Sequence, residues 1–304
     1  MAVAPLTQPA TPERVETEAG GASPGRNGSR SLASQVLFLI LLIGCSVLFL
    51  APFAWLISAS LKVRSEVFNF EWLPDPVNWV NYVRVWQAAP LFTWLKNSVI
   101  VGLLGSVAVT ISSAAVAFGF AYFRFRGRDF MFGLVLATMM LPGAVTMVPV
   151  FLIWNRLDLV NTLVPLWAGN LFGSAFYIFL LRQFYLTVPR ELFDAARVDG
   201  ANYFQMWWRI ALPLTSTALI VVFIFEFKAL WTDLLKPLIY LYDNALFTMP
   251  RGIKTLLDRF GQGGEMQWEI VLAATVILTL PLVVLFFFGQ RYFIEGISTT
   301  GTKG

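Results

Sequence analysis

The 304-residue sequence has no histidine and only one cysteine. Without histidine, the chain lacks the commonest metal ligand and general base, which disfavours the usual metal and enzyme sites. Cys45 cannot form a disulfide within the chain, and we expect its small side chain to be buried. The sequence also contains no GxxxxGK[ST] motif, so it has no phosphate-binding loop of that kind and is not predicted to hydrolyse ATP.

Charged residues are scarce as well. They make up 13% of the chain, against about 25% in a soluble globular protein. Hydrophobic residues reach 57% and gather in long runs, which is typical of a polytopic membrane protein. The net charge of +4 is small and the basic residues are scattered, so nucleic acid is not an expected partner.

Six of the hydrophobic runs are long enough to cross a bilayer, which predicts an all-α protein with six transmembrane helices. The predicted spans are residues 37–57, 98–122, 130–154, 163–181, 211–230 and 270–288. An even number of spans places both termini on one side. The short turn after the second span contains Arg124, Arg126 and Arg128, which marks that side as cytoplasmic.

These spans divide the chain into five parts. Residues 1–32 are rich in Ala, Pro, Gly, Ser, Thr and Glu and are predicted to be a disordered cytoplasmic tail. A first transmembrane anchor (33–58), an outer loop (59–94), a transmembrane domain (95–293) and a cytoplasmic tail (294–304) follow. The apolar run after the tail is too long for a cleaved signal peptide.

Several residues within the spans stand out. Gly102, Ser106, Thr110 and Ala114 recur every four residues, which favours close helix packing over a polar pore lining. Pro142, Gly143 and Pro149 predict a kinked third span, either beside a translocation path or for packing alone. We interpret Glu226 and Lys228 as an interfacial pair near the outer surface, with the lysine extended towards water.

The polar segment 189–214 lies between the fourth and fifth spans. Pro189 suits the first turn of a helix, and Gly200 interrupts the helical pattern. Apolar residues on either side of Gly200 form two short stripes: Leu192, Ala195, Ala196 and Val198, then Tyr203, Phe204, Met206, Trp207 and Ile210. The pattern predicts a helix–turn–helix elbow outside the bilayer. An amphipathic helix lying on the lipid surface is the alternative.

The spacing within this elbow resembles the EAA loop of binding-protein-dependent ABC importer permeases. That loop has an acid and two alanines, a glycine after three more residues, then nine residues and Ile-x-Leu-Pro. Here the matching residues are Asp194, Ala195, Ala196, Gly200, Ile210, Leu212 and Pro213. Asp194 stands where the family usually has glutamate, which keeps the charge but shortens the side chain by one methylene.

The resemblance extends over roughly two-thirds of the chain, from about residue 91 to the end. LPGAVTMVP, FLLRQFYLTVPREL, WTDLLKPLIYL and QRYFIEG…GTKG are similar to the smaller permease of maltose-type sugar importers. The resemblance implies a type I ABC importer permease fold with a cytoplasmic coupling helix, in a bacterial or archaeal cytoplasmic membrane. It also implies a homologous second permease, two ATPase subunits that bind ATP and magnesium, and an extracytoplasmic solute-binding protein. The chain itself is expected to bind no cofactor and to be no enzyme.

The same resemblance implies an ATP-driven importer of a carbohydrate, coupled to its ATPases through the elbow. It further implies that the loop around Phe260, Gly261, Gly263 and Gly264 reaches into the binding protein, although a solvated linker is the alternative reading. The closing GTKG is expected to touch the ATPase dimer.

Candidate residues of the substrate pathway are few. Pro142 lies at the predicted kink, and Asn170, Trp231 and Asp233 are of the types that stack on sugars or bond their hydroxyls. An importer for a non-sugar solute remains an alternative. A self-contained secondary transporter is less favoured because no internal repeat is evident, and an intramembrane enzyme would need a nucleophile–base set that the sequence does not show.

Overall fold

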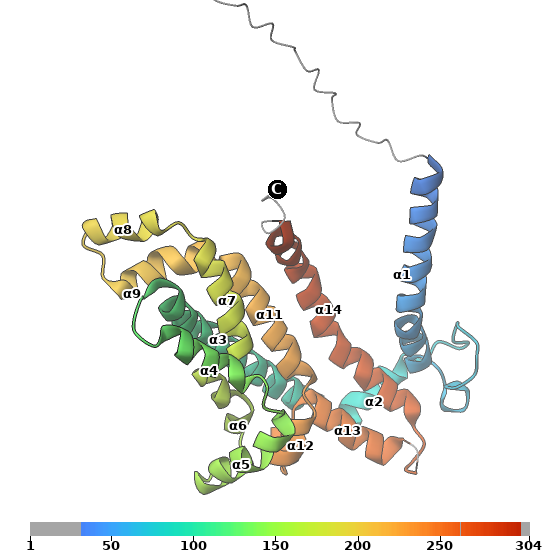
Figure 1. Ribbon diagram of the computed structural model, residues 1–304. Coiled ribbons are helices and arrows are strands. Elements are labelled where there is room, and N and C mark those ends of the chain that lie inside the picture. Colours follow the sequence, from blue (N-terminus) through green and yellow to red (C-terminus); the bar gives the residue numbers. More distant parts are fainter. Residues whose placement is uncertain (1–31, 262, 299–304) are drawn as a thin grey trace, which may run out of the picture. The chain divides into compact units, whose positions relative to one another are not determined.

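The computed structural model describes residues 32–261 and 263–298, and the side chains of these residues as far as Tyr292. The predicted disordered tail, apart from Leu32, and the closing GTKG lie outside this part of the chain. Every regular element among the described residues is a helix, which confirms the all-α prediction (Figure 1).

Contacts divide the chain into two units, Met1–Ala51 and Pro52–Gly304. Helix α1 (Leu32–Ser60) contains the described residues of the first unit. Its side chains from Leu32 to Leu50 are exposed, because no other described element belongs to this unit. Cys45 is therefore exposed, and the prediction that it is buried is wrong.

The centre of the second unit is α3 (Leu91–Tyr122), which packs against α7 (Ala175–Thr187) and α11 (Ser216–Thr232) (Figure 1). Small residues of α3 bring these helices close. A Cβ atom on Gly102 would lie 2.8 Å from the Phe227 ring, and one on Gly105 would lie 2.4 Å from Leu230. This contact confirms that Gly102 serves helix packing.

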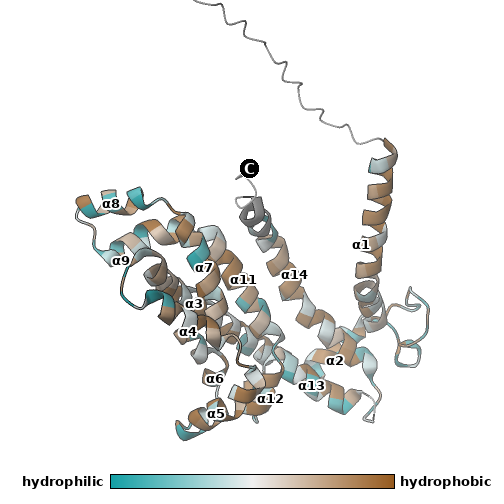
Figure 2. Ribbon diagram, viewed as in Figure 1, coloured by the Kyte–Doolittle hydropathy of each residue, from teal (hydrophilic) through white to brown (hydrophobic). Residues whose placement is uncertain are grey.

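Shorter helices surround this centre. Before α3 lie η1 (Arg64–Glu66) and α2 (Val80–Ala88), and after it α4 (Arg128–Thr138), α5 (Gly143–Arg156), α6 (Val164–Trp167) and η2 (Ala168–Phe172). Beyond α11 the chain forms α12 (Leu235–Tyr240), η4 (Asn244–Leu246), α13 (Met249–Phe260) and the long α14 (Trp268–Ser298). In Figure 2 the long helices are mainly hydrophobic, whereas α13 carries clear hydrophilic stretches.

Within the part of the chain that the structure describes, four helical segments are long and apolar enough to cross a membrane: Leu32–Ser60, Leu91–Tyr122, Val164–Thr187 and Trp268–Tyr292. Two bent pairs raise the number to six if each pair is one span. The first pair, α4 and α5, is bent by 94° just before Gly143, so the third predicted span is broken rather than merely kinked. The second pair is bent by 79° where α11 begins.

Two buried apolar clusters hold the second unit together. One gathers residues near the start of α3 with α13 and the first turns of α14, including Trp94, Met249 and Ile270. The other lies towards the far end of α3 and includes Phe118, Tyr185 and Phe193. The second cluster fixes the position of the polar segment that follows α7.

Candidate functional site

The polar segment after α7 forms the predicted helix–turn–helix elbow. Its first arm is α8 (Arg190–Val198), which begins after Pro189. Its second arm is a continuous run of α9 (Tyr203–Met206), the π-helical turn η3 (Trp207–Ala211) and α10 (Leu212–Leu214).

Gly200 ends the first arm in a defined turn. Its φ of +82° is left-handed, a conformation that glycine adopts readily. The Gly200 N–H donates to the Arg197 carbonyl at 3.0 Å, and the Ala201 N–H donates to the Ala196 carbonyl at 2.9 Å. This pair of bonds is the Schellman motif, which satisfies carbonyls that a helix end leaves free. The Ala-Ala-x-x-x-Gly spacing of the sequence is therefore the spacing of a helix C-cap.

The second arm starts two residues after this cap. The Asn202 side chain accepts a hydrogen bond from the Gln205 N–H, and the Gln205 side chain accepts one from the Asn202 N–H, both at 2.9 Å. This reciprocal capping box satisfies two N–H groups that the first helical turn leaves free. A C-cap followed at once by an N-cap leaves the elbow little freedom to bend.

One face of α8 is anchored to α3. Phe193 is 4% exposed, and its ring centroid lies 5.8 Å from that of Phe118 and 5.3 Å from that of Tyr122. Of the first predicted stripe, only Ala196 is partly buried, whereas Leu192, Ala195 and Val198 are exposed. The predicted stripe lies on the wrong side of the helix, because Phe193, which is not part of it, is the residue that packs against α3.

Tyr122, the last residue of α3, joins both arms. Its hydroxyl accepts a hydrogen bond from Arg197 Nη2 at 2.9 Å, and its ring lies 6.1 Å from that of Tyr203. Phe123 packs edge-on against Tyr203 at 5.0 Å. The elbow therefore rests on the end of α3 that leads into the arginine-rich turn containing Arg124.

The second predicted stripe is divided in the same way. Met206 and Trp207 are buried, Ile210 is half-buried, and Tyr203 and Phe204 are exposed. At the π-turn the Leu212 N–H donates to the Trp207 carbonyl, five residues back. Pro213 has no N–H to continue a regular ladder, and the chain bends by 79° into α11 just beyond it.

The face of α8 that points away from α3 carries Glu191, Asp194, Ala195 and Val198. These residues follow the i, i+3, i+4, i+7 spacing of one helix face, and all four are exposed. Val198 is 89% exposed, which is unusual for an apolar residue on a rigid helix. The arrangement offers a small mixed acidic and apolar surface on a firmly held support.

A second set of polar residues lies where η2 meets α7 and the helical backbone is interrupted. Gly173 has a φ of +78° between η2 and α7. Serines of α3 satisfy the freed backbone: Ser112 Oγ donates to the Asn170 carbonyl at 3.1 Å, and the Ser174 N–H donates to Ser113 Oγ at 3.1 Å. Irregular backbone at membrane depth is tolerated where protein groups satisfy it in this way.

Asn170 is the centre of this set. Its Nδ2 donates to the Gly105 carbonyl at 3.1 Å and to Glu226 Oε1 at 2.6 Å. The Tyr177 side chain of α7 also interacts with Glu226. Glu226 therefore binds Asn170 and does not pair with the exposed Lys228, so the predicted interfacial pair is wrong. The physical reason is that residues two apart on a helix point in different directions.

The other candidates of the substrate pathway lie apart from this set. Trp231 is fully buried and donates from Nε1 to the Leu278 carbonyl of α14 at 3.0 Å. Asp233 accepts from the Leu235 N–H at 3.0 Å and pairs with Lys236 at 3.8 Å. Pro142 is exposed just before α5. The structure brings Asn170 together with Glu226, but not with Pro142, Trp231 or Asp233.

The loop between α13 and α14 is less open than the sequence indicates. Phe260 is 3% exposed and belongs to the first buried cluster. Gly261 and Gly264 sit against backbone carbonyls, since a Cβ on either would lie within 2.4 Å of one. Gly263, with a φ of +86°, has open space around it. Phe260 is thus part of the core, and among the described residues of the loop Gly263–Met266 are exposed.

Comparison with known proteins assigns this architecture to a family. Residues 106–299, which include the elbow and the polar set around Asn170, match the binding-protein-dependent transport system inner membrane component. The chain belongs to this family.

Individual members are similar over most of the chain. The arabinooligosaccharides transport system permease protein AraQ of Halalkalibacterium halodurans is 34% identical over 281 residues, covering 89% of this chain and 98% of AraQ. The sn-glycerol-3-phosphate transport system permease protein UgpE of Yersinia pestis is 32% identical over 267 residues, covering 85% of this chain and 94% of UgpE.

A solved structure shares the fold. One chain of a bacterial ABC transporter involved in the import of the acidic polysaccharide alginate has a TM-score of 0.75 and 22% identity, covering 87% of this chain and 99% of that one. As a member of the family, the chain is a multi-pass inner-membrane permease subunit of an ABC importer that depends on a binding protein, and it is not an enzyme. A self-contained secondary transporter is excluded as its function.

Proposed function

We propose that this permease imports a carbohydrate and receives the energy of ATP hydrolysis through the elbow. The substrate class rests on the relatives, whose names specify arabinooligosaccharides and sn-glycerol-3-phosphate, and on the alginate importer that shares the fold. The partners are a homologous second permease, two ATPases that hold ATP and magnesium, and an extracytoplasmic binding protein. An importer of a non-sugar solute is the alternative.

The observation that carries the coupling role is the rigidity of α8 combined with its exposed outer face. Phe193 locks α8 to α3, and the C-cap at Gly200 and the capping box at Asn202 fix the turn. A push on the exposed face of Asp194, Ala195 and Val198 therefore reaches the long helices instead of bending the elbow. Alternating access requires this kind of rigid-body transmission between two states.

In this proposal each bent pair counts as one span, which gives six spans and a type I importer permease arranged around α3. The elbow lies against the end of α3 that continues into Arg124, Arg126 and Arg128. Short arginine-rich turns favour the cytoplasm, so the elbow, with the exposed face of α8, and both termini are cytoplasmic. The GTKG end, which lies outside the described residues, keeps its proposed contact with the ATPase dimer.

The loop between α13 and α14 would face the binding protein from the opposite side. Its exposed part runs from Gly263 to Met266, and Arg259 pairs with Glu265 at 3.2 Å across it. This pair links the end of α13 to the described part of the loop, which favours insertion into a partner over a solvated linker.

The test of the whole proposal is uptake by the reconstituted complex. We expect proteoliposomes that contain both permeases, the ATPases and the binding protein to accumulate a labelled sugar only when ATP and magnesium are supplied inside. Binding of pentose and hexose oligosaccharides and glycerol phosphates to the binding protein is measured first. The solute that binds most tightly is then used in the uptake experiment. Accumulation without ATP, or of amino acids in preference to sugars, would refute it.

The polar set around Asn170 is the proposed site where the solute passes this subunit. Asn170, Glu226 and Tyr177 come from three different elements and supply the donors and acceptors that sugar hydroxyls need. Replacing Glu226 with leucine should lower the rate of uptake by roughly 10-fold or more, because the Asn170 amide loses its acceptor and the solute loses a ligand. Glu226→Gln, which keeps an acceptor oxygen, should retain more activity.

Uptake rates at several solute concentrations, with ATPase assembly measured in parallel, check this prediction. Lys228→Met is the matched control, since Lys228 is exposed on the same helix and should be dispensable. Equal rates for Glu226→Leu and Lys228→Met would remove the polar set from the pathway.

A further inference from the structure

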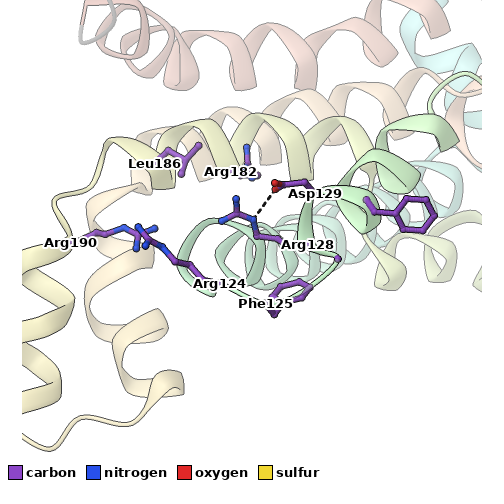
Figure 3. A pocket seen from close by; sticks show the side chains of 9 residues that line it. Arg124, Phe125, Arg128, Asp129, Arg182, Leu186 and Arg190 are labelled. Atoms are coloured by element: carbon purple, nitrogen blue, oxygen red, sulfur yellow. Dashed lines mark hydrogen bonds and ion pairs between the residues drawn. The ribbon is translucent and has the colours of Figure 1, made fainter.

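A hollow of about 580 Å³ opens beside the elbow and is lined by four arginines. Arg124 comes from the turn after α3, Arg128 begins α4, Arg182 comes from α7, and Arg190 begins α8. Figure 3 shows these side chains converging on the space between the turn and the end of α7. The topology signal accounts for the arginines of the turn, but not for their gathering with Arg182 and Arg190.

The charge of the hollow is largely uncompensated. Among the described residues that line it, Asp129 is the one acid, and it is already paired with Arg128 at 2.9 Å. Within the described residues, no carboxylate lies within 4.0 Å of Arg124, Arg182 or Arg190. Three arginines therefore face the hollow without an acid, and like charges held this close favour the binding of an anion.

Arg182 packs against an aromatic ring. Its guanidinium lies 4.4 Å from the centre of the Phe132 ring, and its Nε is buried with no hydrogen-bond partner in the described chain. A buried donor left unpaired is costly, so an anion within reach of this group would be stabilised by it. The first residues of α4 and α8 also line the hollow, and helix N-termini add partial positive charge.

An apolar groove adjoins the hollow. The groove has a volume of about 370 Å³, runs along the last turns of α3 past Val116, Gly119 and Phe120, and shares Arg124 and Phe125 with the hollow. A Cβ on Gly119 would meet nothing within 4 Å, so the groove is open to the outside of the helix. An anion site that continues into an apolar groove on a membrane-spanning helix has the chemistry of a phospholipid.

We propose that the arginine hollow binds the phosphate of an acidic phospholipid and that the groove along α3 holds one of its acyl chains. Phe125 and Phe130 at the rim are 44% and 72% exposed, as expected for side chains at the boundary between headgroups and acyl chains. Basic pockets at the inner ends of spans attract the anionic lipids of that leaflet. A peptide or a free phosphate would use the hollow but not the groove.

The position of Arg190 gives the lipid a role. Arg190 opens α8, whereas Arg124 follows α3 and Arg182 lies on α7, so one phosphate bound among them would tie the elbow to two spans. The consequence for coupling rests on the proposed function of the elbow. Binding of the lipid does not, and it can be measured without transport.

The test is lipid retention by the purified full-length chain. Native mass spectrometry in a mild detergent, after incubation with equal amounts of phosphatidylglycerol and phosphatidylcholine, counts the lipids that remain bound. Each arginine near the headgroup contributes about 1 kcal/mol, so Arg124→Gln with Arg182→Gln should weaken phosphatidylglycerol binding by roughly 10-fold or more. The control, Arg84→Gln with Arg156→Gln, removes two exposed arginines outside the hollow and should bind as the wild type does.

Two further experiments identify the ligand. Gly119→Phe leaves the arginines in place but fills the groove, and it should weaken phosphatidylglycerol binding in its turn. Inorganic phosphate at millimolar concentration should not displace the lipid. Lysine at positions 124 and 182 should restore most of the binding, which separates loss of charge from misfolding.

Three results would overturn the proposal. The first is equal retention by the glutamine pair and its control, and the second is displacement by inorganic phosphate, which would identify a free-anion site. The third is loss of the lipid from the assembled importer with all four arginines intact, which would show that a partner subunit occupies the hollow.

Discussion

Replacing Gly200 with valine should abolish ATP-driven uptake while leaving the chain inserted in the membrane. The left-handed φ of +82° costs a residue with a Cβ roughly 1–2 kcal/mol, and a β-branched residue more. The backbone strain is most easily relieved if the C-cap unwinds. Unwinding breaks the hydrogen bonds from the Gly200 and Ala201 N–H groups to the end of α8. The elbow then bends when it is pushed. Nothing lies within 4 Å of a Cβ at this position, so the core of the spans is not disturbed.

Uptake by proteoliposomes, together with the amount of chain in the membrane fraction, checks this expectation. Gly200→Asn is the matched variant, because asparagine is of similar size but tolerates the left-handed conformation, and it should keep most of the activity. Loss of uptake in both variants would mean that the space beside residue 200, and not its backbone, is what matters. Normal uptake by the valine variant would contradict a rigid elbow.

The elbow is the part of the molecule that could be predicted best from the sequence. Pro189, Gly200 and Pro213 are local signals, and each acts on the backbone beside it. The structure places helix ends or breaks next to all three. The π-turn at Trp207 has no comparable signal, because it depends on how the second arm must reach both the cap at Asn202 and the start of α11.

The direction in which α8 faces could not be predicted from the same residues. Apolar side chains lie on more than one side of α8, and the nine-residue helix is too short for its period to choose between them. The side of α8 that faces α3 is determined by the contacts of Phe193 with Phe118 and Tyr122, which are far away in the sequence. From the sequence alone, Tyr122 is predicted only as the end of a span.

Long-range contacts also explain why the sequence does not predict the partner of Glu226 or the arginine hollow. Glu226 and Lys228 look like a pair in the sequence because they are neighbours, but Glu226 turns towards Asn170 on a different element. In the sequence, the arginines of the turn after α3 indicate only which side of the membrane the turn is on. Arg182 and Arg190 complete the hollow, and nothing in the local sequence links them to Arg124.

The exposed face of α8, which contains Asp194 and Ala195, is the proposed contact surface for the ATPases. Arginine at Asp194 and at Ala195 should prevent the ATPases from assembling with the permease, because both residues lie on the exposed face and the change replaces an acid and a small side chain with two large cations. Ala196 is unsuitable for this test, since it is partly buried against the second apolar cluster and arginine there would damage the fold.

Co-purification of the ATPases with the tagged permease measures assembly, and we expect a loss of at least about 10-fold, as desolvated charge mismatches at an interface cost several kcal/mol. Glu71→Arg with Gln87→Arg is the matched control, because it changes the charge equally at two exposed residues that precede α3. Proteolysis of both variants should give the wild-type pattern. If the ATPases still copurify in full with the Asp194 and Ala195 variant, the contact must lie elsewhere on the inner surface, since a helix face cannot accept two arginines at the centre of a docked interface without losing affinity.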